Sequence, residues 1–175
     1  VLATYEAVTS VLNNPTKMGY CHVGKVLDNG NTSYSIGDRV VSNASHGDVA
    51  RVPMNLTAKI PDNVDDDEAA FTVLGAIALQ GIRLISPTIG ETVVVTGLGL
   101  IGLLAVQILK ANGCRVIGID IDNSKCDLAK SFGAEVINLS NNEDPIEYCN
   151  AITKAVGVDA VLITASSKNL SLIHI

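Results

Sequence analysis

The chain has no tryptophan, few aromatic residues and few basic residues. Aromatic side chains make up 3% of its 175 residues, and 12 lysines and arginines stand against 18 aspartates and glutamates, for a formal net charge of −6. Surfaces that bind nucleic acid carry clusters of lysine or arginine, and this sequence has no such cluster. The composition therefore argues against a nucleic-acid partner, and the expected partner is a small-molecule substrate.

Cysteines and long apolar runs are also scarce. The four cysteines, Cys21, Cys114, Cys126 and Cys149, form no Cys-x-x-Cys pair. A disulfide framework is therefore not expected, and the expected compartment is a reducing cytoplasm. No apolar run reaches the length that crosses a bilayer, and the first residues lack the basic start of a signal peptide. We therefore expect no membrane partner.

The most informative segment that is present runs from Glu91 to Gly102 and reads ETVVVTGLGLIG. It places a buried strand, a Gly-x-Gly-x-x-Gly turn and the start of a helix in immediate succession. Gly97 permits the tight turn, Gly99 lets the backbone approach a pyrophosphate, and Gly102 lets the helix lie against the sheet. Free amides at the helix start would then face the anion. This order predicts a dinucleotide-binding site.

A second strand follows the helix and ends at Asp120, 23 residues after Gly97. A carboxylate at that place accepts hydrogen bonds from the ribose hydroxyls, and its charge repels the extra phosphate of NADP. The sequence therefore favours NAD over NADP, although Lys125 is close enough to reach toward the ribose. The predicted cofactor-binding residues are Gly97, Leu98, Gly99, Leu100, Ile101, Gly102, Asp120, Lys125, Ala165 and Ser166.

Two compositional regimes divide the chain near Pro87. Before it, short β-like runs at 24–27, 38–42 and 49–53 are separated by turn residues. After it, strands predicted at 92–96, 115–119, 135–138 and 160–164 alternate with three helices, which is typical of a parallel sheet covered on both faces. The last helix is expected to start at the cap Asp144 with Pro145 in its first position, and to end at Gly157.

The expected fold is α/β. Residues 87–175 are predicted to form an incomplete Rossmann domain with a doubly wound parallel sheet, and residues 1–86 a mostly β domain with a hinge helix. The chain begins without methionine and stops soon after the fourth predicted strand. We therefore expect a fragment, whose unfinished sheet edge favours a homo-oligomer or a fused partner domain.

Several segments in order resemble the medium-chain dehydrogenase/reductase superfamily of zinc-type alcohol dehydrogenases. They are Pro15–Val26, Ile36–Val40, Val52–Pro61, Gly97–Gly102, Gly118–Asp120 and Leu128–Ala134. The resemblance implies that the first domain is part of a GroES-like catalytic domain and the second part of a Rossmann domain. Within the superfamily, residues 2–10 and 72–83 look most like the dehydrogenase half of bacterial bi-domain oxidoreductases.

The departures from the zinc-dependent members bear on catalysis. Those enzymes carry Gly-His-Glu where this chain reads Gly19-Tyr20-Cys21, and residues 71–83 contain no cysteine, histidine or acid. Catalytic zinc needs three protein ligands and an open position, so no metal site is expected. The resemblance puts Tyr20 at the former ligand position, where its phenol could donate to a carbonyl oxygen. Packing without a chemical role is the alternative for this residue.

The leading hypothesis is an NAD-dependent oxidoreductase without catalytic zinc, which transfers a hydride to or from a carbonyl or alcohol, in one version a sugar derivative. A second hypothesis is a non-catalytic nucleotide-binding scaffold for a fused or partner domain. A third is an NADPH-dependent quinone-type reductase, which Asp120 argues against. Methyl transfer is a fourth, because methyltransferases also bind adenosine at such a turn. In the simplest alternative, the three glycines serve packing alone.

Replacing Asp120 by alanine tests the choice of cofactor. We expect NADH binding to weaken more than NADPH binding, because the carboxylate accepts from the ribose hydroxyls of NADH and repels the phosphate of NADPH. The two dissociation constants, measured by calorimetry for the wild type and the variant, check this. Equal losses for the two cofactors would contradict it.

Overall fold

The computed structural model describes residue 9 and residues 17–165, and the chain separates into two compact units, Val1–Val73 and Leu74–Ile175. The boundary predicted between residues 86 and 87 lies after the helix α3 (Thr72–Ile85), whereas the division into units lies near its start. The difference arises because Ala78 and Ile82 of α3 belong to the apolar core of the second unit.

The first unit contains a three-stranded antiparallel sheet in the order β1-β2-β3. Its strands are β1 (His22–Lys25), β2 (Arg39–Ser42) and β3 (Thr57–Lys59). Its small core holds Val41, Ile60 and Ala69, the last from the short helix α2 (Asp66–Ala69). The 3-10 helix η1 (Met54–Leu56) precedes β3. The predicted β character of this unit is confirmed.

One strand expectation in the first unit is wrong. Residues 49–53 form no strand, and the third strand begins only at Thr57. Val49 is 74% exposed, and Pro53 has no amide proton to donate to a ladder. The run was apolar in composition, but it has neither a buried face nor a complete set of donors.

The second unit is built on a parallel sheet in the order β6-β5-β4-β7. The strands are β4 (Thr92–Thr96), β5 (Arg115–Asp120), β6 (Glu135–Asn138) and β7 (Ala160–Ile163). The chain moves outward from β4 through β5 to β6 and then returns to the other side of β4. Such a reversal is the topological switch point at which α/β sheets bind ligands, beyond the carboxyl ends of the strands.

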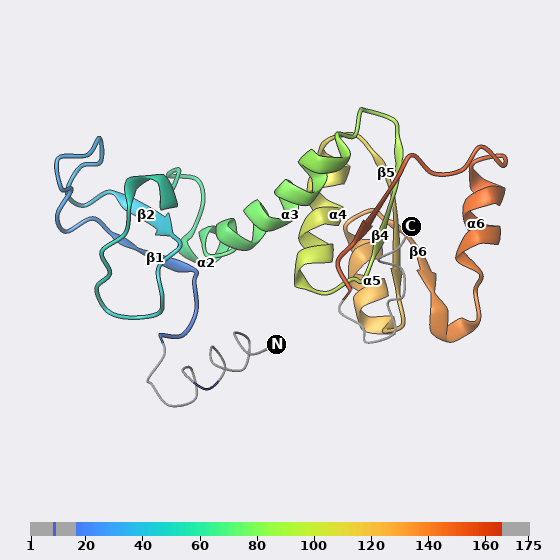
Figure 1. Ribbon diagram of the computed structural model, residues 1–175, viewed down its shortest axis with the longest axis horizontal. Coiled ribbons are helices and arrows are strands. Elements are labelled where there is room, and N and C mark those ends of the chain that lie inside the picture. Colours follow the sequence, from blue (N-terminus) through green and yellow to red (C-terminus); the bar gives the residue numbers. More distant parts are fainter. Residues whose placement is uncertain (1–8, 10–16, 166–175) are drawn as a thin grey trace. The chain divides into compact units, whose positions relative to one another are not determined.

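Helices cover both faces of this sheet (Figure 1). One face packs against α3, α4 (Leu100–Ala111) and α5 (Asn123–Ser131), around a core that includes Val93, Val95 and Leu109. The other face holds Val94, Ile117 and Ile137, and packs against α6 (Pro145–Ile152). The 3-10 helix η2 (Leu139–Asn141) follows β6. The predicted doubly wound α/β fold is confirmed.

The start of α6 agrees with the sequence, but its end does not. Asp144 caps the helix and Pro145 takes its first position, as predicted. The helix ends at Ile152 and not at Gly157, because the hydroxyl of Thr153 donates to the Cys149 carbonyl at 2.7 Å and accepts from the Gly157 amide at 3.0 Å. Lys154 and Ala155 then take positive φ angles of 55° and 64°, which no helix continues through.

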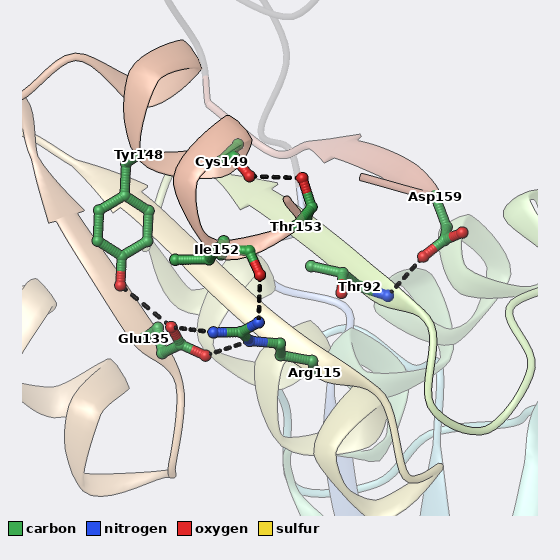
Figure 2. Close-up of polar contacts among 8 residues, drawn as sticks. All are labelled: Thr92, Arg115, Glu135, Tyr148, Cys149, Ile152, Thr153 and Asp159. Carbon is green, nitrogen blue, oxygen red and sulfur yellow. Dashed lines mark hydrogen bonds and ion pairs between the residues drawn. The ribbon is translucent and has the colours of Figure 1, made fainter. Parts of the chain in front are cut away.

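An ion pair joins β5 to β6 below α6, as Figure 2 shows. Arg115 donates from Nε to Glu135 Oε1 at 2.5 Å and from Nη2 to Oε2 at 2.8 Å. Its third donor, Nη1, reaches the Ile152 carbonyl at 3.3 Å, and the Tyr148 hydroxyl donates to Glu135 at 3.1 Å. The hydrogen bonds from Arg115, against the opposing effect of partial burial and with help from Tyr148, lower the pKa of Glu135.

Replacing Glu135 by glutamine should lower the free energy of unfolding by about 1 kcal/mol at pH 7. The pair is bidentate and shared by three elements, but its side chains are 40% and 36% exposed, which limits its strength. Asp127→Asn, which removes the more exposed ion pair with Lys130, is the matched control and should cost about 0–0.5 kcal/mol. Urea unfolding measures both.

The stability that Glu135 contributes should depend on pH. Because the folded pKa of Glu135 lies below its ordinary value of 4.5, the stability that it contributes is present above that value and is lost as pH falls through the folded pKa. The gap between the wild type and Glu135→Gln should therefore close in acid. A gap that stayed constant from pH 7 to pH 2 would contradict this account.

Candidate functional site

The glycine turn leaves the carboxyl end of β4 and enters α4. Gly97 has a φ of +92°, and a Cβ there would lie 2.6 Å from the Ala165 amide nitrogen. A side chain at Gly102 would lie 1.9 Å from the carbonyl oxygen of Gly97. Real Cβ atoms do not approach backbone so closely, so these two positions need glycine for the fold itself.

Gly99 differs from the other two glycines. Its φ of −70° is open to any residue, and a Cβ built on it meets nothing within 4 Å. It is the N-cap of α4 and supplies no capping side chain. Among the described residues no acceptor is bonded to the amides of the first turn, Leu100 to Gly102, which by helix geometry have no partner within the helix. Open space therefore lies directly before free amides, as a pyrophosphate requires.

Leu98 turns inward. Its side chain is fully buried and packs over Gly118 of β5, where a Cβ would lie 2.9 Å from Leu98 Cδ2. Its amide donates to Asp120 Oδ2 at 2.7 Å. Leu98 was predicted to surround the pyrophosphate, but its side chain is buried and its amide is already bonded, so it offers no free donor for that role. Leu100 and Ile101 begin α4. Leu100 is 48% exposed, and Ile101 is partly buried against the apolar core.

Asp120 is anchored at the end of β5. Besides the Leu98 amide, it accepts from the amides of Ile121 at 2.7 Å and Asp122 at 3.0 Å, both through Oδ1. A carboxylate offers about four lone-pair positions, so about one acceptor position, on Oδ2, is free for a ribose hydroxyl. Partial burial raises the pKa of Asp120, but the three amides and nearby Lys125 outweigh it and lower the pKa below its ordinary value of 3.8. The group is therefore a carboxylate at neutral pH.

The remaining cofactor residues lie at the same end of the sheet or outside the described range. Lys125 is on α5 with its side chain 45% exposed, and its Nζ lies 3.9 Å from Asp122 Oδ2. Ala165 lies against Gly97, just beyond β7. Ser166 lies outside the described residues. The predicted roles of these side chains in binding stay predictions.

Sequence reasoning missed Thr164. This residue follows β7, and its hydroxyl donates to the Gly97 carbonyl at 2.6 Å. A hydroxyl at the end of an apolar strand was the available signal, but its meaning depends on β7 lying beside β4, which the strand order supplies.

In the first unit, Tyr20 precedes β1 and is 51% exposed, and its catalytic role stays a prediction. The ring of His22 donates from Nε2 to the Gly47 carbonyl at 2.9 Å, because a carbonyl can only accept. The ring of His46 fills the space where a Cβ of Gly19 would be. No group of three potential metal ligands gathers among the described residues. The absence of zinc also stays a prediction.

Comparisons with known proteins agree with this geometry. A family model described as "Zinc-binding dehydrogenase" matches residues 101–172. An alcohol dehydrogenase of Geobacillus stearothermophilus is 30% identical over 139 residues, which cover 79% of this chain and 39% of that protein. The chain belongs to the medium-chain dehydrogenase/reductase superfamily. The family model matches within the parallel-sheet unit and does not reach Tyr20.

Solved structures of this superfamily share the fold. Alcohol dehydrogenase TADH from Thermus sp. ATN1 superposes with a TM-score of 0.77 at 22% identity, over 93% of this chain and 60% of that one. The quinone oxidoreductase of Escherichia coli, solved in complex with NADPH, gives 0.66 at 27% identity, over 85% and 49%. This chain spans about two fifths of the length of the Geobacillus stearothermophilus alcohol dehydrogenase. The likeness to bi-domain oxidoreductases stays a prediction.

Serine placed at Gly99 or Gly102 should separate the two kinds of glycine. Gly99→Ser enters open space and adds a capping hydroxyl, so the free energy of unfolding should stay within about 0.5 kcal/mol of the wild type. Gly102→Ser pushes a Cβ into the Gly97 carbonyl and should cost about 1–3 kcal/mol. Urea unfolding measures both. Equal stabilities of the two variants would show that the close approach of Gly102 to the Gly97 carbonyl is not needed for the fold.

Proposed function

We propose that this chain is part of an NAD-dependent oxidoreductase that transfers a hydride to or from a carbonyl or alcohol substrate without catalytic zinc. The observation that carries the proposal is the open space at Gly99, which lies before free helix amides and in the same turn as the amide bonded to Asp120. An anion and a diol can be bound side by side at such a place.

The residues present fit the adenosine half of a nicotinamide dinucleotide. The first-turn amides of α4 would hold the pyrophosphate, and the free acceptor position on Asp120 would take a ribose hydroxyl. The nicotinamide, when bound, supplies the hydride chemistry, and the protein contributes orientation and electrostatics. In this proposal Tyr20 donates a hydrogen bond to the substrate oxygen, the role that zinc has elsewhere in the superfamily.

The preference for NAD rests on the charge of Asp120. Its pKa lies below the ordinary value, so at neutral pH the carboxylate would repel a phosphate on the ribose. The alternative, an NADPH-dependent quinone-type reductase, is favoured by one observation, the likeness to the Escherichia coli quinone oxidoreductase that binds NADPH. Lys125, with its exposed ammonium group, is the side chain that would serve a phosphate in that case.

A scaffold that binds NAD without hydride transfer fits the same cofactor half-site. A measured hydride transfer would identify the dehydrogenase, because the scaffold binds the cofactor without reacting. The four cysteines are free thiols, which supports a reducing, cytoplasmic setting. No described helix is long and apolar enough to cross a membrane.

Calorimetric titration of the purified chain with NADH and with NADPH, at one ionic strength, tests the proposal. We expect NADH to bind more tightly, because Asp120 repels the additional phosphate. Gly99→Ser should weaken both cofactors about tenfold or more, since its side chain occupies the place of the pyrophosphate while the fold is kept. Tighter NADPH binding would favour the reductase, and binding of neither cofactor would reject the site.

A further inference from the structure

One peptide group in the glycine turn is held at both ends by side chains. The peptide between Gly97 and Leu98 accepts at its oxygen from Thr164 Oγ1 at 2.6 Å, and donates from its nitrogen to Asp120 Oδ2 at 2.7 Å. Asp120 ends β5 and Thr164 follows β7, so the two side chains come from the strands on either side of β4.

This peptide needs an external restraint. Glycine is the most permissive residue, and Gly97 lies at a φ of +92°, in a turn between β4 and α4 that contains a second glycine, Gly99. A rotation of the peptide plane would move the Gly97 carbonyl, which already lies where a Cβ of Gly102 would be. The orientation of this plane therefore sets how the turn meets the first turn of α4.

We propose that Thr164 is a positioning residue for the pyrophosphate of the dinucleotide. Together with Asp120 it fixes the Gly97–Leu98 peptide, and through it the direction of the free amides of α4. This inference rests on the proposed function. It also gives Asp120 two tasks, holding the turn and facing the ribose, whereas Thr164 has only the first.

The division of tasks predicts different cofactor dependences. Loss of the Thr164 hydroxyl should weaken NADH and NADPH by the same factor, because both carry the same pyrophosphate. Loss of the Asp120 carboxylate should weaken both through the turn and NADH further through the ribose. Thr164→Val thus shows the effect of a loosened turn alone, with which the effect of Asp120→Ala on each cofactor can be compared.

Valine is the suitable substitution because it keeps the branched shape. The Thr164 hydroxyl also lies 3.3 Å from the Thr96 carbonyl, but the backbone amide of Thr164 donates to the same carbonyl at 2.9 Å, so the pairing of β7 with β4 is kept without the hydroxyl. Thr164→Ser keeps the hydroxyl and removes only the methyl group, so this variant should bind both cofactors like the wild type. Thr153→Val, which removes a similar hydroxyl bond at the end of α6 (Figure 2), is the matched control away from the turn.

The experiment combines calorimetry with amide hydrogen exchange in the full chain. For Thr164→Val we expect about three- to tenfold weaker binding of both cofactors, and faster exchange of the Leu98 amide in the absence of cofactor, while exchange of the Val94 amide stays unchanged. Thr164→Ser and Thr153→Val should bind like the wild type. Thermal unfolding establishes that each variant is folded.

The outcomes separate the two proposals. Wild-type binding of NADH with unchanged binding by Thr164→Val would overturn the role of Thr164 and leave the proposed function standing. A loss for one cofactor alone, or an equal loss in Thr153→Val, would also overturn it. If the wild type binds neither cofactor, the proposed function fails, and faster Leu98 exchange in Thr164→Val would then assign the hydroxyl to the fold and not to binding.

Discussion

The close contact between α4 and the turn that precedes it constrains everything else in the second unit. Because residue 102 has no side chain, the helix backbone can lie directly on the Gly97 carbonyl. That approach brings the helix start to the carboxyl end of β4. In the same turn, the Leu98 side chain fills the space above Gly118, and the Leu98 amide donates to the Asp120 carboxylate. The absence of a side chain at residue 102 therefore sets how closely the helix start approaches the glycine turn.

Features that depend on local sequence could be predicted well. The glycine spacing specified a turn between a strand and a helix, and the four parallel strands begin at the residues expected from their apolar runs. The cap of α6 at Asp144 followed from the aspartate and proline pair. These features share a cause: backbone conformation and short-range hydrogen bonds decide them within a few residues.

Features that depend on distant partners could not be predicted in the same way. The inward direction of Leu98 requires the gap left by Gly118, and the role of Thr164 requires β7 to lie beside β4. The early end of α6 depends on one threonine that satisfies both a carbonyl and an amide. The run at 49–53 resembled a strand, yet neither sheet formed by the described residues pairs with it. In each case tertiary context outweighed the local pattern.

The strand order has a consequence for how the chain is made. The hydrogen bond from Thr164 to Gly97 spans 67 residues, so on a ribosome that adds about 5–20 residues per second the turn emerges on the order of several seconds before its hydroxyl partner. Contacts of such long range carry a high loop-closure cost and form late. The glycine loop would therefore reach its final geometry only after β7 docks on β4. The second unit would then bind a nucleotide only after its folding is complete.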